Sequence, residues 1–305
     1  MSSTQSLPLE GESVDAELVP IREISRVTGV NTVTLRAWER RYGLLVPQRT
    51  SKGHRLYSRS DIQRVKEVQL WLGRGLAISK VKALLANQTL AQNEQVIDSN
   101  WIQLAQQIYT AINNFQRKPL ERLIADTLAL YPAEMVADYL FIPLMDDLAG
   151  NEPGMSARRA FFSNLALEMI LEAQARQRQS AAGERILLLS PTEQENPLLA
   201  QLFGYSLLIN QHPIEYLGYL NPQEALLACQ ALNAKIVVLI GYDTVNAAGL
   251  QLHLTSLLEK SAVQIVVVGE LIAPFPALDL AGQPAVKPCT NQQEAVLFIN
   301  QFLKG

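Results

Sequence analysis

Basic, hydroxyl and aromatic side chains are concentrated in one short segment, residues 31–42, whose sequence favours a helix. Such side chains hydrogen-bond to base edges and to phosphate oxygens when a helix enters the major groove of DNA. For the tryptophan in this segment, packing into a small core is an equal alternative to phosphate contact. The candidate DNA contacts on the helix are Thr32, Thr34, Arg36, Trp38, Arg40, Arg41 and Tyr42.

Two short helices must position these side chains. The first is predicted to open on Pro20, which suits a first helical turn, and to end at Gly29 after the apolar stripe of Ile21, Ile24 and Val27. The second opens on Asn31, a favourable N-cap residue. Two helices that meet at a glycine-containing turn indicate a helix-turn-helix.

A hairpin is predicted directly after these helices, from Leu45 to Tyr57, with Lys52-Gly53 near its tip. Such a wing lies against the DNA backbone beside the groove, where its contacts give affinity and register without reading sequence. Its candidate phosphate contacts are Arg49, Lys52, His54, Arg55 and Tyr57.

The distribution of charge supports a nucleic-acid-binding segment. Residues 20–87 hold fourteen Lys or Arg against four Asp or Glu, a balance of +10, whereas the whole chain carries −3. Residues 1–19 contribute −4, and residues 88–305 contribute −9. The alternative is a solvated basic face on an ordinary helical domain, but the positive charge coincides with the helix pair and the wing, which favours DNA.

The wing and its flanks resemble the MerR family of bacterial transcription regulators. The Arg-x-Tyr-x-x-x-Asp signature of that family is present as Arg55, Tyr57 and Asp61. The segments 35–45, 71–75 and 78–85 resemble one branch, which holds the MlrA-type biofilm regulators and the light-responsive CarH/LitR-type repressors. The resemblance implies a homodimer that binds palindromic promoter DNA and acts on RNA polymerase at the promoter.

Length and composition predict several domains. The chain has 305 residues, 48% of them hydrophobic, with no apolar run long enough to cross a membrane and no secretory leader, so we expect a cytoplasmic protein. The predicted fold is multidomain: an all-α winged helix-turn-helix, a four-helix bundle and a doubly wound α/β domain. The predicted boundaries are 1–18 for a disordered tail, 19–87 for the DNA-binding domain, 88–100 for a linker, 101–180 for the bundle and 183–305 for the α/β domain.

Short apolar runs alternate with helices after residue 183, which predicts a buried parallel sheet of flavodoxin-like type. The ligand crevice of such a sheet lies beyond the carboxyl ends of its strands. The predicted bundle helices are 101–117, 119–131, 133–150 and 156–179. The predicted strands are 185–190, 214–218, 235–240 and 263–269, and the helices among them are 197–211, 222–232, 246–260 and 291–303.

The bundle followed by this sheet resembles the cobalamin-binding module of the light-responsive repressors, but the ligand residues of that module are missing. Gln194, Asn196 and Leu199 stand where the acid, histidine and glycine of the lower-ligand motif belong, and an amide cannot replace imidazole on cobalt. Gly241 replaces a serine, and Glu270 replaces one of two paired glycines that admit the nucleotide tail. The Trp-x9-Glu-His signature of the bundle fails after Trp101. We therefore expect no cofactor.

Catalysis and metal binding have little support in the sequence. No nucleophile and base, phosphate loop or metal-ligand spacing is present, Glu193 and Glu195 are two acids in a solvated loop, and Cys229 and Cys289 are too far apart for a zinc site. We expect no enzyme. Three hypotheses for the C-terminal part stay open: a ligand-independent regulatory or assembly module, a platform for a sensor partner protein, and a small-molecule sensor responsive to adenosylcobalamin or another ligand.

Overall fold

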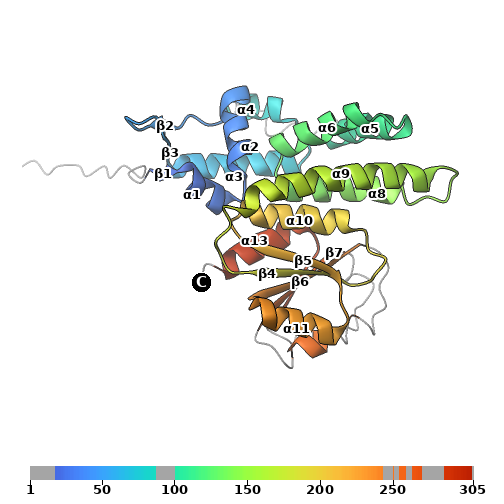
Figure 1. Ribbon diagram of the computed structural model, residues 1–305. Coiled ribbons are helices and arrows are strands. Elements are labelled where there is room, and N and C mark those ends of the chain that lie inside the picture. The colour runs from blue at the N-terminus through green and yellow to red at the C-terminus, as the bar shows by residue number, and fades with distance from the viewer. Residues whose placement is uncertain are drawn as a thin grey trace, which may run out of the picture.

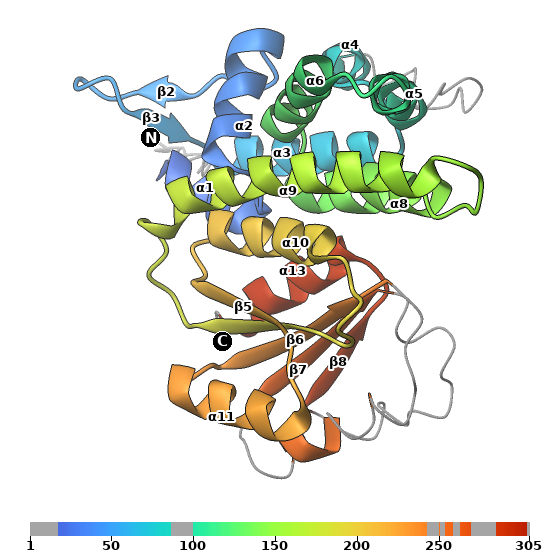
Figure 2. The same cartoon turned by 45° about the vertical axis from the view of Figure 1, so that its right-hand side comes forward.

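The computed structural model describes residues 18–86, 100–242, 250, 254–258, 263–269 and 285–303. The helices that precede residue 87 and the hairpin lie at one corner of the molecule, and a group of longer helices lies between them and a β-sheet (Figures 1 and 2). This order in space follows the order in sequence.

The N-terminal part forms the predicted helix-turn-helix. Gly29 caps the first helix with a left-handed backbone, φ +75°, and Asn31 caps the second by accepting a hydrogen bond from the Val33 backbone NH at 2.9 Å. The second helix continues as a five-residue π-helical segment, a local distortion that the sequence did not predict. These elements are α1 (Ile21–Thr28), α2 (Thr32–Ala37), η1 (Trp38–Tyr42), α3 (Arg59–Gly73) and α4 (Ile78–Ala86).

The predicted hairpin is confirmed as a wing. Strand β2 (Gln48–Arg49) pairs antiparallel with β3 (Arg55–Tyr57), and β1 (Val19–Pro20) pairs with the other edge of β3. Gly53 lies at the tip with φ +80°, a conformation that glycine adopts without strain. Strand β1 was not predicted, and with it the otherwise helical domain includes a small three-stranded sheet.

The middle helices follow the prediction in number and order, with two differences. The helix predicted over 101–117 ends at Asn113. The predicted helix 133–150 is divided into α7 (Ala133–Val136), η3 (Ala137–Phe141) and α8 (Ile142–Asp147). Pro143 lacks a backbone NH, so regular α-helical bonding cannot pass through this position, and a π-helical segment precedes it. The other helices are α5 (Asn100–Asn113), α6 (Arg117–Leu130) and α9 (Met155–Arg178).

The C-terminal part contains the predicted parallel sheet, with strand order β5-β4-β6-β7-β8. Numbered within the domain, this is the doubly wound order 2-1-3-4-5. The last strand was not predicted because its four residues, Val-Lys-Pro-Cys, form no apolar run. The strands are β4 (Ile186–Ser190), β5 (Ile214–Tyr219), β6 (Ile236–Gly241), β7 (Gln264–Gly269) and β8 (Val286–Cys289).

Helices cover both faces of the sheet. α10 (Pro197–Ile209) and α13 (Gln292–Phe302) lie on the face toward the middle helices, and α11 (Pro222–Leu232) lies on the opposite face (Figure 1). Successive side chains of a strand point to opposite faces of the sheet, so Leu188 packs with α10 and Leu187 packs with α11. The predicted helix 246–260 falls mostly outside the described residues.

One hydrophobic core joins the N-terminal helices to the rest of the chain. It runs without interruption from Ile24 in α1 through Phe141 in η3 to Ile209 in α10. The DNA-binding helices are therefore packed onto the middle helices and onto α10.

Candidate DNA interface and the strand-end crevice

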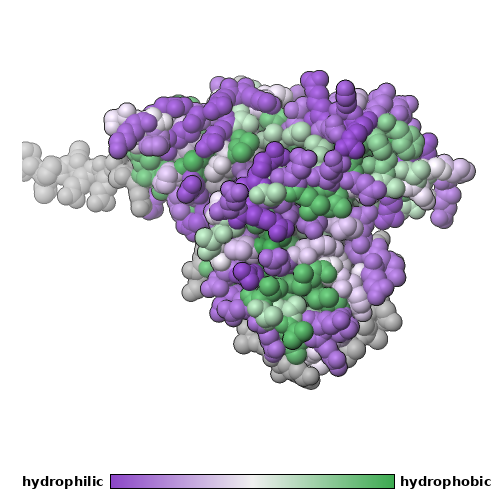
Figure 3. All heavy atoms as spheres, viewed as in Figure 1, coloured by the Kyte–Doolittle hydropathy of each residue, from purple (hydrophilic) through white to green (hydrophobic). Residues whose placement is uncertain are grey.

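One face of the second helix is exposed and basic. Val33, Arg36 and Arg40 are exposed at spacings of three and four residues, which places them on one face, and Arg41 is exposed beside them. No acidic side chain pairs with these arginines in the described part of the chain. Hydrophilic residues dominate the part of the surface that holds these helices and the wing (Figure 3). Val33 was not predicted as a contact, although a valine here is suited to a thymine methyl group.

Three of the candidate contact residues are buried instead. Thr34 and Trp38 have at most 1% of their surface exposed, and the Trp38 indole NH donates to the Leu130 carbonyl of α6 at 2.8 Å. Tyr57 is fully buried, and burial raises the pKa of its hydroxyl to about 12. The expectation of DNA contact is corrected for these three residues to a packing role. Thr32 and Tyr42 are half-buried at the rim.

The wing presents Arg49, Lys52 and His54 to solvent, as predicted. Arg55 is mostly buried at its base, where its guanidinium hydrogen-bonds to the Glu39 carboxylate. Arg49 donates to the other oxygen of the same carboxylate at 3.2 Å. Glu39 therefore fixes two wing arginines relative to the second helix, a role that the sequence analysis missed because the two segments are not adjacent in sequence.

The Arg-x-Tyr-x-x-x-Asp signature has a structural explanation. Arg55 holds Glu39, Tyr57 fills the core, and Asp61 closes the capping box at the start of α3 with Ser58. These residues fix the wing between the second helix and α3.

Hydrogen bonds add to the core that joins the DNA-binding helices to the C-terminal part. Asn31, the N-cap of the second helix, donates from Nδ2 to the Tyr205 hydroxyl of α10 at 3.4 Å. On the other side, the Trp101 indole NH donates to the Leu72 carbonyl at 3.0 Å, and the Asn100 backbone NH donates to the Gly75 carbonyl at 2.9 Å. The second helix is thus bonded to α10, and the end of α3 and the turn after it are bonded to α5.

A buried carboxylate lies in this joint. Glu134 of α7 is only 6% exposed, and a methyl group added at Gly29 would come within 3.9 Å of its Oε1 atom. Burial raises the pKa of Glu134 to about 7, against the smaller opposing effects of hydrogen bonds from its own backbone and from Ser206. No cationic side chain forms an ion pair with Glu134 among the described residues. The turn between the two DNA-binding helices therefore packs against a group that titrates near neutrality.

The strand-end crevice uses its polar residues for local structure. Asn196 caps α10 by accepting a hydrogen bond from the Leu198 backbone NH at 2.9 Å. Gln194 is exposed, and Leu199 is buried in the core. None of the three positions offers a nitrogen ligand to cobalt.

The carboxyl ends of the central strands are tightly packed. A Cβ atom at Gly241 would lie 2.5 Å from Pro191 Cγ, and the Tyr242 backbone NH donates to Glu195 Oε1 at 2.9 Å. Gly269 has φ +100°, and a Cβ there would lie 2.2 Å from the Gly241 carbonyl oxygen. The ends of β6 and β7 therefore leave no room for a side chain at either glycine. Glu270 lies outside the described residues.

The histidines that follow the helical bundle are His212 and His253. His212 hydrogen-bonds through Nε2 to Asn300 Oδ1 at 2.8 Å, and His253 lies outside the described residues. Across residues 18–86, 100–242 and the shorter described segments, no three His, Cys, Asp or Glu side chains are grouped so that they could hold a metal ion. The helices of that same part include none that is both long and apolar enough to span a membrane.

A winged helix-turn-helix with an exposed basic face is typical of DNA-binding proteins, and this chain has both features. Residues 19–88 match the family described as MerR HTH family regulatory protein. The HTH-type transcriptional regulator MlrA of Escherichia coli K12 is 35% identical over 171 residues, which are 56% of this chain and 68% of that protein. The chain belongs to the MerR family of HTH-type transcriptional regulators.

Two further similarities extend beyond the N-terminal part. The HTH-type transcriptional repressor CarA of Myxococcus xanthus is 26% identical over 222 residues, 72% of this chain and 75% of that protein. A crystal structure of a cobalamin-binding protein from Desulfitobacterium hafniense is matched over 68% of this chain and 99% of that chain, at 14% identity and a TM-score of 0.33.

Proposed function

We propose that this regulator binds a palindromic promoter site sequence-specifically as a homodimer and that its C-terminal part controls that binding without cobalamin. The observation that carries the proposal is the exposed face of Arg36, Arg40 and Arg41, which no acidic residue of the described chain neutralises. Two such faces related by a twofold axis would enter successive major grooves. The wing residues Arg49, Lys52 and His54 would contact the phosphates beside each groove.

Signal input is proposed to reach the DNA-binding helices through the contacts of α10 and α6. Asn31 is bonded to α10 of the C-terminal part and Trp38 is bonded to α6 of the middle helices, so a shift of α10 or α6 would move the second helix. A sensor partner protein is one source of such a shift. RNA polymerase at the promoter, a cytoplasmic location and biofilm or light-response target genes are part of the same proposal and follow from the resemblance.

Fluorescence anisotropy with DNA from the upstream region of the protein's own gene tests the DNA-binding proposal. Arg40→Ala should weaken binding by about 1–3 kcal/mol, which is roughly fivefold to 150-fold, if Arg40 contacts a base. Lys52→Ala should weaken binding to all sequences and reduce the slope of log K against log salt by about 0.9. Arg122→Ala, at an exposed position of α6, is the control and should change neither quantity.

Equal affinity for the upstream DNA and for a scrambled duplex would contradict sequence-specific binding. Sedimentation of the chain with and without the duplex tests the homodimer, and one chain per duplex would contradict it.

An adenosylcobalamin-responsive repressor is the alternative. Its test is the visible spectrum of the full chain after incubation with adenosylcobalamin in the dark and removal of free ligand. We expect no retained corrin absorbance, because Asn196 is a helix cap and Pro191 occupies the space next to Gly241. Retained absorbance would support the alternative.

A further inference from the structure

A hollow lies among the middle helices, where they meet the end of α3. It is a groove of about 720 Å³ between α5 on one side and η3 with α8 on the other, closed at one end by the turn after α3, residues 73–75. Ligand pockets in proteins commonly enclose about 300–1,000 Å³. The spacing from Trp101 to Thr110 along α5 makes the groove about 14 Å long, at about 1.5 Å per helical residue.

The end of the groove next to α3 is aromatic and fixed. The rings of Trp101 and Tyr139 are nearly parallel, 24° apart, with centroids separated by 5.7 Å. Trp101 is held by Leu72 and by the tilted ring of Tyr131 at 4.7 Å. Ile102 is 58% exposed along the same wall. Trp101 is only 5% exposed, so a planar ring bound here would contact Tyr139, which is 37% exposed, and Ile102, while Trp101 supports Tyr139 from behind.

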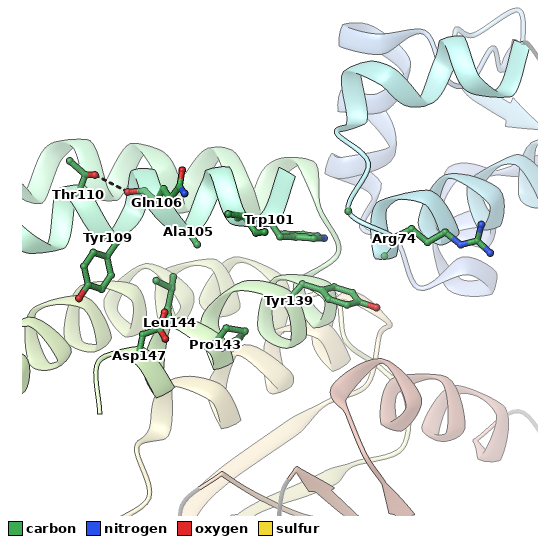
Figure 4. A pocket seen from close by; sticks show the side chains of 13 residues that line it. Arg74, Trp101, Ala105, Gln106, Tyr109, Thr110, Tyr139, Pro143, Leu144 and Asp147 are labelled. Carbon is green, nitrogen blue, oxygen red and sulfur yellow. Dashed lines mark hydrogen bonds between the residues drawn. The ribbon is translucent and has the colours of Figure 1, made fainter. Parts of the chain in front are cut away.

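The other end of the groove is polar and acidic. Figure 4 shows Tyr109 and Thr110 of α5 opposite Asp147 of α8, at the end away from Trp101 and Tyr139. In the same view the Arg74 guanidinium points away from the groove. It lies 4.9 Å from the ring centroid of Trp71. The charge that faces the groove is therefore the Asp147 carboxylate, and no basic side chain of the described residues pairs with it.

We propose that this groove binds a small aromatic amine, with the ring on the exposed surfaces of Tyr139 and Ile102 and the ammonium group at Asp147. Because Gly73 and Gly75 form one end of the groove, the bound amine connects α5 and α8 to the end of α3. A methyl group at Gly73 would lie 3.3 Å from the Tyr139 hydroxyl, so a shift of Tyr139 on binding moves α3. This regulatory step rests on the proposed DNA-binding function, and the binding step does not.

Binding is tested on the full chain without DNA, by isothermal titration calorimetry with two probes of the same shape. We expect 4-(1-naphthyl)butylamine, whose chain can span the groove, to bind and its anionic counterpart 4-(1-naphthyl)butanoate not to bind. Asp147→Asn should raise the Kd of the amine about threefold to fivefold, because an exposed ion pair contributes at most about 1 kcal/mol. Asp146→Asn, which removes the same charge one residue away and outside the groove lining, should change Kd less than twofold.

A second pair of variants tests the position of the ring. Ile102→Lys places a cation in the groove and should abolish amine binding, whereas Leu227→Lys, on the exposed side of α11, should not. Equal binding of the two probes, or equal effects of Ile102→Lys and Leu227→Lys, would overturn the proposal. So would a change of oligomeric state in Ile102→Lys without amine binding to the wild type, because the groove would then be a contact between two copies.

The regulatory step is measured separately, as the Kd for promoter DNA with and without saturating amine. We expect at least a threefold change. Amine binding without such a change would overturn the regulatory step alone. A chain that binds the amine but no promoter DNA under any condition would contradict the proposed function and leave the binding site intact.

Discussion

The exposed face of the second helix and the carboxyl ends of the parallel strands use their polar residues in opposite ways. Arg36 and Arg40 are exposed and unpaired by acids within the described chain, so they keep their bonding capacity for another molecule. At the strand ends, Asn196 caps a helix and Glu195 accepts a backbone hydrogen bond, so their capacity is used within the chain. Both regions occupy the places where their folds normally bind a ligand, but the first is open and the second is packed.

The residues that identify the family of this chain differ from the residues that are exposed for contact with a ligand. Arg55, Tyr57 and Asp61 form the most recognisable motif of the DNA-binding part, and all three stabilise the position of the wing. The exposed arginines on the second helix form no comparable motif. A signature can therefore identify the fold of a binding surface without identifying its contacts.

The largest expected effect concerns Trp38, which we assign to the buried side of the second helix. Trp38→Ala should lower the free energy of unfolding by about 3–5 kcal/mol, because it leaves a cavity and removes the hydrogen bond to Leu130. Urea unfolding measures this change, and Arg40→Ala, an exposed substitution, should stay within about 0.5 kcal/mol of the wild type. A stable Trp38→Ala variant that fails to bind DNA would move Trp38 to the DNA-binding face.

The second prediction concerns Glu134, where the two regions meet. Its pKa is about 7 in the folded chain and 4.5 in the reference state, so the folded chain binds more protons between these values. The free energy of unfolding should therefore fall, on the order of 3 kcal/mol, as the pH rises from about 4.5 to about 7, with little further change from this group above 7.

Urea unfolding across this pH range measures the effect, with Glu134→Gln as the matched variant. The difference between variant and wild type should grow in favour of the variant as the pH rises. Parallel pH profiles for the two proteins would show that Glu134 is not the group responsible. Asp138, whose pKa is also raised by burial, adds a slope of the same sign that Glu134→Gln leaves in place.

The third prediction tests how closely the strand ends are packed. Gly241→Ser introduces the serine that the resemblance to a cobalamin-binding module implies at this position, but its Cβ would overlap Pro191. We expect a loss of about 1–3 kcal/mol in the free energy of unfolding and no corrin absorbance after incubation with adenosylcobalamin. Normal stability together with retained absorbance would show that the crevice opens, which would remove the contrast between the two regions.

The smallest effect is expected at Asn196. Asn196→Ala should lower stability by about 1 kcal/mol through loss of the cap on α10, and Asn196→Ser should recover most of it, because serine also caps helices. Thermal or urea unfolding of the pair measures the difference. If both variants are as stable as the wild type, the cap does not stabilise the fold. A former role in ligand binding would then better explain the polar residue at this position.

The elements of the fold were largely predictable because each carries a local pattern. The glycine turn at Gly29, the N-cap at Asn31 and the tip at Gly53 follow from local residue preferences, and three of the five strands, β4, β6 and β7, are built on continuous apolar runs. The fourth, β5, has an apolar run interrupted by Glu215. The fifth, β8, contains Pro288 and a lysine, so its position depends on pairing with β7. The π-helical segments were not predictable from helical periodicity.

The candidate site was predictable only in part. Periodicity places Arg36 and Arg40 on one face, but it does not show which face a neighbouring segment covers. Trp38 and Thr34 are buried because other elements pack on that side, and the bond from Trp38 to Leu130 spans 92 positions. Glu39 was missed for the same reason, since its partners lie on the wing.

The continuous core between the N-terminal helices and α10 limits how this chain can be recombined. A chimera cut between α4 and α5 would leave Ile24, Leu35 and Trp38 beside a foreign surface unless the donor also supplied the matching faces of α6 and α10. Exchange of DNA specificity between relatives is therefore more readily achieved by replacing exposed side chains on the second helix than by replacing the whole N-terminal segment. The part of such a protein that must be exchanged as a whole is larger than the segment that contacts DNA.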